Sequence, residues 1–409
     1  PVKGGFIVFD TFAEAIMPLI ADKPFAQSLD LELGFRYGDN NISGTTETWK
    51  AGLNWAVNDS VRVRVMQQRA ARAPNVGEIA SPITSSLDNA TRDPCSVANT
   101  AISATLRALC ISTGMTNAQV GTVPDIIAGQ INSFSGTNPG KLPAPEEADT
   151  FTAGIVFTPS FIPVLKNPIL SLDYYDIEVN GYISELGAQE VLDLCYVQGN
   201  PAFCGQIIRQ AGNLIFPGSG IQLFTQNLAY KKAAGYEIGA AFGLDLADLG
   251  LNEKWGNLNF SFNANVYTKN ETLSSSASAK IDCLGRYGTQ CGNPSPEYRH
   301  IQRTVWNVGD FQFSYLWRHI GEATVEPVQI PQTFAPFRKI DAFNYIDLTG
   351  AYTFNDNMEV TFGVTNVTNE DPPIVGGEIG STASNGGNTF PSTYDPVGRV
   401  YSLGLNLKF

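Results

Sequence analysis

Six cysteines are the residues of this sequence whose type and spacing predict chemistry most directly. They fall in three close pairs: Cys95 with Cys110, Cys195 with Cys204, and Cys283 with Cys291. Zinc binding is the rival chemistry, but the sequence has no Cys-x-x-Cys spacing and only two histidines, His300 and His319. Pairing between neighbours closes small rings and indicates an oxidising compartment. The sequence therefore predicts three disulfides.

Other reactive chemistry has little support. A Ser/His/Asp hydrolase would need one of the two histidines, and His319 beside Arg318 is typical of a surface residue. We find no Gly-x-Gly-x-x-Gly phosphate-binding motif. The segments TSSLDNATRD, NNISG and FNDNME hold carboxylate and amide oxygens, but they lack the spaced loop of a specific calcium site and are typical of turns. We predict no catalytic residue, no cofactor and no metal site.

Composition narrows the class of protein. The chain has 409 residues, of which 43% are hydrophobic, yet no apolar run approaches the ~20 residues that a membrane helix requires. The net charge of −13 argues against nucleic acid as the main partner. The opening PVKGGFIVFD has neither a charged leader nor an apolar signal core. We therefore expect that a leader was removed or that the segment begins inside a longer protein.

Alternation of apolar and polar residues is the dominant pattern. In TETWKAGLNWAV, Trp49, Leu53 and Trp55 alternate with Lys50 and Asn54, as in a strand with one dry and one wet face. Both a soluble sandwich and a transmembrane β-barrel contain such strands. The alternating segments are 6–18, 29–38, 46–57, 60–69, 150–158, 169–183, 222–246, 257–269, 299–307, 312–319, 344–354, 357–367 and 398–409.

The connections favour the barrel. If the last strand ends in the periplasm, the inner connections are short or moderate and the outer ones are mostly long, which is the asymmetry of outer-membrane barrels. Each cysteine pair then lies within one outer loop. The last outer loop is rich in Gly, Ser, Asn and Pro and is predicted to be mobile surface. The predicted long outer loops are 70–149, 184–221, 270–298, 320–343 and 368–397.

Aromatic placement agrees with this orientation. Trp and Tyr prefer the membrane interface, because one end of the ring is apolar and the other forms hydrogen bonds. Residues 299–307 and 312–319 are predicted to form an antiparallel hairpin with Trp306 and Trp317 facing lipid. The aromatics assigned to inner strand ends are Trp55, Phe157, Trp306, Phe354 and Phe409, and those assigned to outer ends are Tyr37, Tyr315, Trp317 and Tyr401.

Several segments together resemble the barrel half of TonB-dependent outer-membrane receptors, in that family's order. They are QQRAARAPNVGEIA, LPAPEEADTFTAGIVFTP, LDYYDIEVNGYIS, NLAYKKAAGYEIGAAF, IDLTGAYTFNDNMEVTFGVTNVTNEDPP and YDPVGRVYSLGLNLKF. The resemblance implies an all-β antiparallel barrel of about 22 strands around an N-terminal plug, with uptake energised through TonB. Nothing here matches the plug or the TonB box, and thirteen strands are too few. The expectation is the C-terminal part of a longer receptor, or one chain of a split receptor.

The same resemblance assigns a role to the last strand. Alternating apolar residues with a terminal aromatic resemble the sorting signal read by the outer-membrane assembly machinery. The residues concerned are Tyr401, Leu403, Leu405, Leu407 and Phe409. The implied location is the bacterial outer membrane with a periplasmic C-terminus, and the implied partners are the TonB complex, the assembly machinery, membrane lipid and a small-molecule ligand.

Three classes of function remain at this stage. The leading one is a TonB-coupled importer of a scarce nutrient, with a weak preference for an oligosaccharide or other neutral organic ligand because the chain is strongly acidic. A ferric-siderophore receptor of the same family is the alternative. A passive porin-like channel and a barrel enzyme are the other classes. The candidate ligand contacts in outer loops are Tyr196, Phe203, Phe224, Tyr287, Tyr298, Phe334, Phe337, Phe390 and Tyr394.

Overall fold

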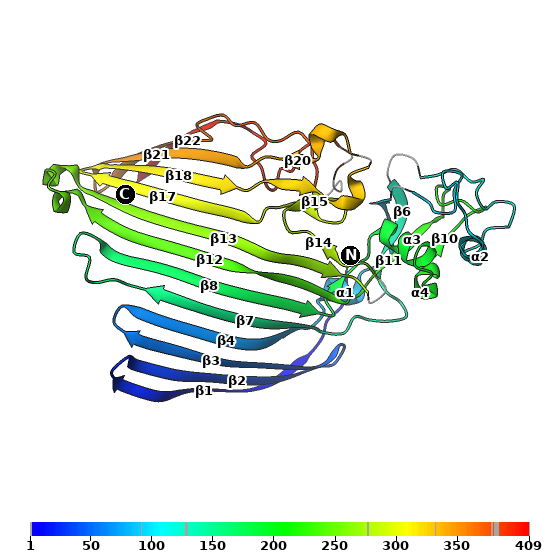
Figure 1. Cartoon of the computed structure of the whole chain (residues 1–409), viewed down its shortest axis with the longest axis horizontal. Coiled ribbons are helices and arrows are strands. Elements are labelled where there is room, and N and C mark those ends of the chain that lie inside the picture. Colours follow the sequence, from blue (N-terminus) through cyan, green and yellow to red (C-terminus); the bar gives the residue numbers. More distant parts are fainter. Residues whose placement is uncertain are drawn as a thin grey trace.

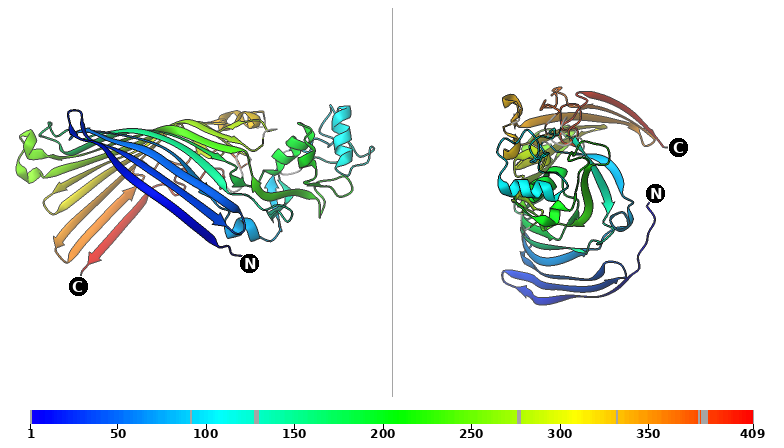
Figure 2. Two further views of the ribbon diagram at one scale, coloured as in Figure 1. Left: turned by 90° about the horizontal axis from the view of Figure 1, so that it is seen from below. Right: turned by 90° about the vertical axis from the view of Figure 1, so that its right-hand side faces the viewer.

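Thirteen antiparallel strands, neighbours in chain order, form one long curved sheet, and the short β14 (Ile281–Asp282) pairs with β13 at its margin (Figure 1). The computed structural model describes residues 2–90, 92–126, 130–275, 278–331, 333–377, 379 and 384–408. Seen along its strands, the sheet is an open trough with the two chain termini near its two edges (Figure 2). The strands are β1 (Val8–Lys23), β2 (Ala26–Asn40), β3 (Gly44–Asn58), β4 (Val61–Arg72), β7 (Glu146–Phe157), β8 (Lys166–Asn180), β12 (Tyr230–Asp245), β13 (Asn257–Leu273), β17 (Tyr298–Val308), β18 (Phe311–Ile320), β21 (Phe343–Asn355), β22 (Met358–Thr365) and β23 (Val400–Leu407).

Each alternating segment of the sequence contains one of these strands, so the predicted all-β antiparallel class is confirmed. The predicted boundaries differ from the strands at several ends, such as β1, which continues to Lys23, and they differ most at the segment 222–246, which holds two strands. Its first part is β11 (Gly220–Asn227), which pairs outside the trough, and β12 begins only at Tyr230. The Asn227 side chain donates to the carbonyls of Ala144 and Gly181 at 2.9 and 2.7 Å, which holds the chain where it changes sheets.

The two faces of the trough differ in polarity. Cross-strand partners lie on one side of a sheet, and here they match in character: Trp306 pairs with Phe313, and Phe362 pairs with Leu403. We call this side the apolar face and the other the polar face. The β17–β18 hairpin turns between Val308 and Phe311, and Trp317 pairs with Gln302, four residues from Trp306. The predicted hairpin is confirmed, and both tryptophans lie on the apolar face; their contact with lipid stays a prediction.

The last strand presents its apolar residues on this same face. Tyr401, Leu403 and Leu405 pair with Val364, Phe362 and Val360, and Leu407 pairs with Met358. Phe409 lies outside the described residues. The alignment is that of a lipid-facing strand, while the assembly role of these residues stays a prediction.

The two ends of the trough also differ. At the short-turn end, β3 and β4 are joined through Asp59 and Ser60, and β21 and β22 through Asp356 and Asn357. At the opposite end, which we call the long-loop end, most connections are long and carry structure of their own (Figure 1). Among the described residues, no helix combines the length and the apolar character needed to cross a bilayer.

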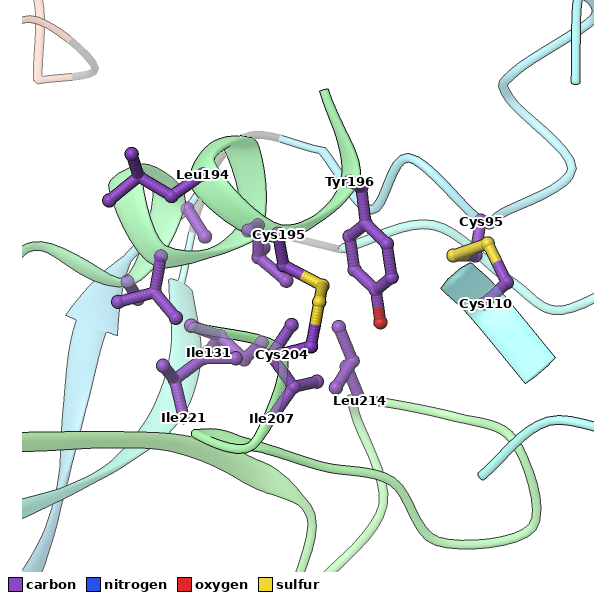
Figure 3. Packing of buried hydrophobic residues seen from close by; sticks show 14 of the residues in the cluster. Cys95, Cys110, Ile131, Leu194, Cys195, Tyr196, Cys204, Ile207, Leu214 and Ile221 are labelled. Carbon is purple, nitrogen blue, oxygen red and sulfur yellow. A yellow bond between two sulfur atoms is a disulfide. The ribbon is translucent and has the colours of Figure 1, made fainter. Parts of the chain in front are cut away.

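Two long connections, 73–145 and 181–229, fold together into a unit that we call the cap. Its small sheet has the order β10-β11-β6-β5, with a parallel β11–β6 pair. Its core includes Ile131, Leu194 and Ile221 (Figure 3). The elements are α1 (Val76–Ala80), β5 (Thr84–Asn89), α2 (Ala104–Ser112), β6 (Gln130–Thr137), β9 (Ile183–Ser184), α3 (Ala188–Tyr196), α4 (Pro201–Cys204), β10 (Ile207–Ile208) and β11.

Three disulfides cross-link residues within the long connections. Cys95–Cys110 and Cys195–Cys204 lie in the cap, where the Tyr196 ring sits between them (Figure 3). Cys283–Cys291 lies in the β13–β17 connection. The three pairs are those that the sequence spacing predicts. Restricting the unfolded chain in this way stabilises a loop by about 2 to 4 kcal/mol per bridge.

A second folded unit, which we call the side lobe, joins connections 274–297, 321–342 and 366–399. Tyr287, Phe390 and Tyr394 are buried together with Ile340 in its core. The loop 368–397 was predicted to be mobile surface, and that prediction is wrong around Phe390 and Tyr394, which are packed. The elements are β14 (Ile281–Asp282), β15 (Arg286–Gly288), β16 (Gly292–Ser295), β19 (Ala323–Val325), η3 (Pro327–Gln329), η4 (Ala335–Phe337) and β20 (Lys339–Ile340).

Candidate functional site on the polar face

Two rows of side chains cross the polar face at the middle of β8, β12 and β13 and at the long-loop ends of β17 and β18. The first row follows cross-strand pairs from Asp173 in β8 through Glu237, Asn265 and Arg299 to Ile320 in β18. The second, two residues nearer the short-turn end, runs through Ser171, Gly239, Asn263, Ile301 and Arg318. The rows line a hollow of about 450 Å³. Polar residues at alternate strand positions thus converge from five strands on one concave site.

Ion pairs fix the two flanks of the hollow. On one flank, Arg64 donates to Asp173 Oδ1 from Nε at 3.0 Å and from Nη2 at 2.8 Å. On the other, Arg318 donates to the Asp347 carboxylate at 3.1 and 3.3 Å, and its guanidinium lies 4.9 Å from the centre of the Tyr345 ring. These pairs are partly exposed, so each contributes little to folding. Their effect is to hold the charges in place.

The centre of the hollow holds charges without such partners. Within the described residues, neither Glu237 nor Arg299 forms an ion pair, and both side chains belong to exposed residues. Arg299 donates to the Tyr267 hydroxyl at 3.3 Å, and its guanidinium stands 5.4 Å from that ring. Adjacent strands lie about 4.8 Å apart, so Glu237 and Arg299, two strands apart, stand roughly 10 Å from each other. A polar ligand can bridge that distance.

Amide and phenol groups complete the site. Tyr175 donates from its hydroxyl to Asn265 Oδ1 at 3.1 Å and meets Tyr267 edge to face at 6.4 Å. Asn263 is exposed in the next row. A side chain at Gly239 would meet Ser171, since an added Cβ would lie 2.5 Å from Ser171 Oγ. Glycine therefore leaves the floor of the hollow open beside groups that can donate to or accept from hydroxyls.

The loop aromatics predicted as ligand contacts divide into two sets. Tyr196 lies in the cap core, and Tyr287, Phe390 and Tyr394 lie in the side-lobe core, so these four rings offer no surface to a ligand as they stand. Phe203, Phe224 and Phe337 are partly buried, while Phe334 is exposed. Tyr298 lies beside the hollow in β17, on the apolar face with His300. The contact role of the accessible rings stays a prediction.

Alternation in the sequence puts Glu237 on the polar face of its strand but does not show that it belongs to a site. The available signal was charge inside alternating strands: Asp173, Glu237, Arg299 and Arg318 all occupy polar positions of strands. Which of these charges meet depends on register across five strands. Register could not be read from one strand at a time.

A family model described as "TonB dependent receptor-like, beta-barrel" matches residues 8–367. The chain belongs to the TonB-dependent receptor family. The family resemblance drawn from the sequence is thereby confirmed. The family comprises receptors and transporters rather than enzymes, and its barrels are outer-membrane proteins.

Solved structures of TonB-dependent receptors share this fold. The ferric enterobactin receptor PfeA of Pseudomonas aeruginosa, as the R480A mutant in complex with enterobactin, has a TM-score of 0.59 at 15% identity, over 98% of this chain and 45% of that one. The siderophore receptor PirA of Acinetobacter baumannii has a TM-score of 0.56 at 14% identity, over 100% and 47%. The FrpB iron transporter of Neisseria meningitidis has a TM-score of 0.53 at 12% identity, over 98% and 45%.

These identities show a common fold and no more. The chain spans less than half the length of the three solved receptors. A comparison with curated protein sequences found no match.

Proposed function

We propose that this chain forms the ligand-facing barrel wall of an outer-membrane importer energised through TonB. The long-loop end is outside the cell and the short-turn end, with the C-terminus, is in the periplasm. The missing part of the receptor supplies the remaining strands, the plug and the contact with TonB. The observation that carries the proposal is the hollow of the polar face, where Glu237 and Arg299 stand without ion-pair partners among the described residues. The hollow crosses the middle of β8, β12 and β13 and reaches the long-loop end at β17 and β18, the end from which a ligand would enter.

The ligand that best fits this hollow is neutral and rich in hydroxyls, such as an oligosaccharide. A carboxylate, a guanidinium, two asparagines and the Tyr175–Tyr267 pair can donate to and accept from hydroxyls, and tyrosine rings offer flat apolar faces to a sugar. The acidic balance of the chain, −13, also disfavours an anion.

A ferric siderophore is the second candidate ligand. Arg299 and Arg318 place two guanidinium groups on the wall of the hollow, and guanidinium binds carboxylates and other oxyanions strongly. The solved structures with this fold include receptors named for siderophores. This candidate predicts that the arginines, rather than Glu237, dominate affinity.

Direct binding to the complete receptor separates the candidates. Calorimetry would compare a linear neutral oligosaccharide series with a ferric tricatecholate siderophore, using the whole receptor that contains this chain. Saturable binding of the neutral series, lost when Glu237 and Arg299 are changed together, supports the leading assignment. Binding of the ferric complex alone would assign a siderophore as the ligand, and binding of neither would contradict both ligand assignments.

A further inference from the structure

The connection between β12 and β13, at the short-turn end, has secondary structure of its own and is not a simple turn. It contains two short 3₁₀ helices, η1 (Leu246–Leu249) and η2 (Glu253–Trp255), which project at the left of Figure 1. The Leu246 N–H donates to the Gly256 carbonyl at 3.0 Å and closes the segment. Gly256 has a φ of 67°, and an added Cβ there would clash with the Asn307 carbonyl. We call residues 246–256 the rim turn.

The rim turn exposes large apolar side chains. Leu249, Leu251 and Trp255 are 55%, 51% and 51% exposed, and Phe161, in the neighbouring β7–β8 turn, is 70% exposed. Lys166 ties the two turns together, because its Nζ lies 2.8 Å from Asp248 Oδ2 and 3.6 Å from Asp245 Oδ2. Four apolar side chains are therefore held on adjacent turns without being covered by the protein.

These side chains continue the apolar face of the barrel. The Trp255 ring stacks on Trp306 with centroids 6.0 Å apart, and the Trp306 indole donates to the Trp255 carbonyl at 2.8 Å. Phe161 lies 6.1 Å from Phe157 between ring centroids. Trp306 and Phe157 belong to the apolar face, since they pair with Phe313 and Leu170. The turns thus meet the barrel wall on the side that faces lipid.

We propose that the rim turn and Phe161 form an interfacial anchor that inserts into the headgroup region of the phospholipid leaflet beside the short-turn end. Leucine and tryptophan side chains favour that boundary, where an indole can bury its ring and keep its N–H hydrated. Lys254, Glu253 and Asp248 supply the charges that stay in the headgroup layer. Continuity with the lipid-facing wall favours lipid over a periplasmic protein as the occupant. The proposal does not depend on which ligand the barrel carries.

Site-specific photo-crosslinking in membranes tests the anchor. The photoreactive residue p-benzoylphenylalanine would replace Leu249 or Leu251 in the complete receptor, with Val197 of the cap, 64% exposed, as the matched control position. Heat-modifiability would check folding of each variant. Mass spectrometry of irradiated receptor should show phospholipid adducts at positions 249 and 251 and none at 197.

Two results would overturn the anchor. Adducts with another protein at positions 249 and 251, without phospholipid, would assign the rim turn to a protein partner. Equal phospholipid labelling at all three positions would show that exposure alone accounts for the reaction. If either substitution prevents folding, Trp255 fluorescence can be measured instead, as the difference between the parent and Trp255→Phe in brominated phospholipids. Quenching of Trp255 by the brominated lipid supports the anchor. Absence of quenching contradicts it.

Discussion

Arg209 and Asp93 are 116 residues apart in the chain and form a fully buried, bidentate ion pair. Both guanidinium–carboxylate distances are 2.8 Å, and the two side chains are 0% and 2% exposed. Arg209 also donates to the Tyr196 hydroxyl and to the Gly212 carbonyl. Since Asp93 lies in connection 73–145 and Arg209 in connection 181–229, this pair joins the two connections into one cap.

Removing one partner should unfold the cap selectively. Arg209→Ala leaves Asp93 buried without its counterion, which should cost about 3 to 5 kcal/mol. Arg92→Ala is the matched control, because Arg92 pairs with Asp193 at the cap surface, where the side chains are 61% and 34% exposed, and should cost less than about 1 kcal/mol. Hydrogen exchange of α3 and β11 peptides measures both. Equal effects of the two substitutions would contradict the assigned role of the buried pair.

The barrel strands could be predicted from the sequence because their signal is local. Val61, Val63 and Val65 alternate with Arg62 and Arg64 whatever the neighbouring strand is, so a period of two identifies the strand and its faces. The residue at which a strand ends is harder to predict from the sequence. Alternation continues from β11 into β12, and only the contacts of Asn227 with distant carbonyls show that the chain changes sheets there.

The cap and the hollow could not be predicted because they depend on distant contacts. Leu192 and Ile131 form a core only after connections some sixty residues apart in sequence come together. Tyr287 and Phe390 were interpreted as ligand contacts because they are aromatic residues in predicted outer loops, yet the two rings pack edge to face at 5.5 Å. The hollow likewise depends on the register that places Glu237 beside Asn265 and Asn265 beside Arg299.

Charge removal in the hollow should weaken ligand binding without changing the barrel. Glu237→Gln and Arg299→Ala should each cost about 1.5 to 3 kcal/mol, or roughly 10- to 150-fold in Kd, for a ligand that both residues bind. Arg62→Ala is the control, because Arg62 is exposed on the polar face but does not line the hollow. Titration calorimetry on the complete receptor provides the Kd values. An Arg62→Ala effect as large as the other two would show that the loss reflects general charge.

Cap stability should rise on acidification through Glu190. Burial of Glu190 in α3 raises its pKa above the ordinary 4.5, against hydrogen bonds from Ser274 and Ser278 that lower it. A carboxyl with a raised folded pKa binds its proton more tightly in the folded state, so the cap gains stability as pH falls from above that pKa towards 4.5. Hydrogen exchange across this pH range gives the stability of the parent and of Glu190→Gln. The difference between the two isolates the contribution of Glu190 from that of Glu185. A difference that does not change with pH would contradict the buried assignment.

Deleting Phe409 should impair assembly more than changing its neighbour. Tyr401, Leu403, Leu405 and Leu407 align on the apolar face, and the terminal aromatic is predicted to complete the assembly signal. The deletion loses burial of about 1.5 to 3 kcal/mol in addition to recognition. Lys408→Ala is the control, since Lys408 has the parity of the polar face. Immunoblots of folded, heat-modifiable receptor in the outer membrane compare the two, and equal amounts would remove the proposed signal.

Whether this barrel wall belongs to an energised importer can be decided from the initial rate of ligand uptake by whole cells. The labelled ligand would be the one identified by calorimetry, and the strains would be the parent, a receptor deletion and a strain without functional TonB. Saturable uptake is expected in the parent, and loss of that uptake is expected in both other strains. Uptake that requires the receptor but continues at the parental rate without TonB would contradict an energised importer and identify a passive channel.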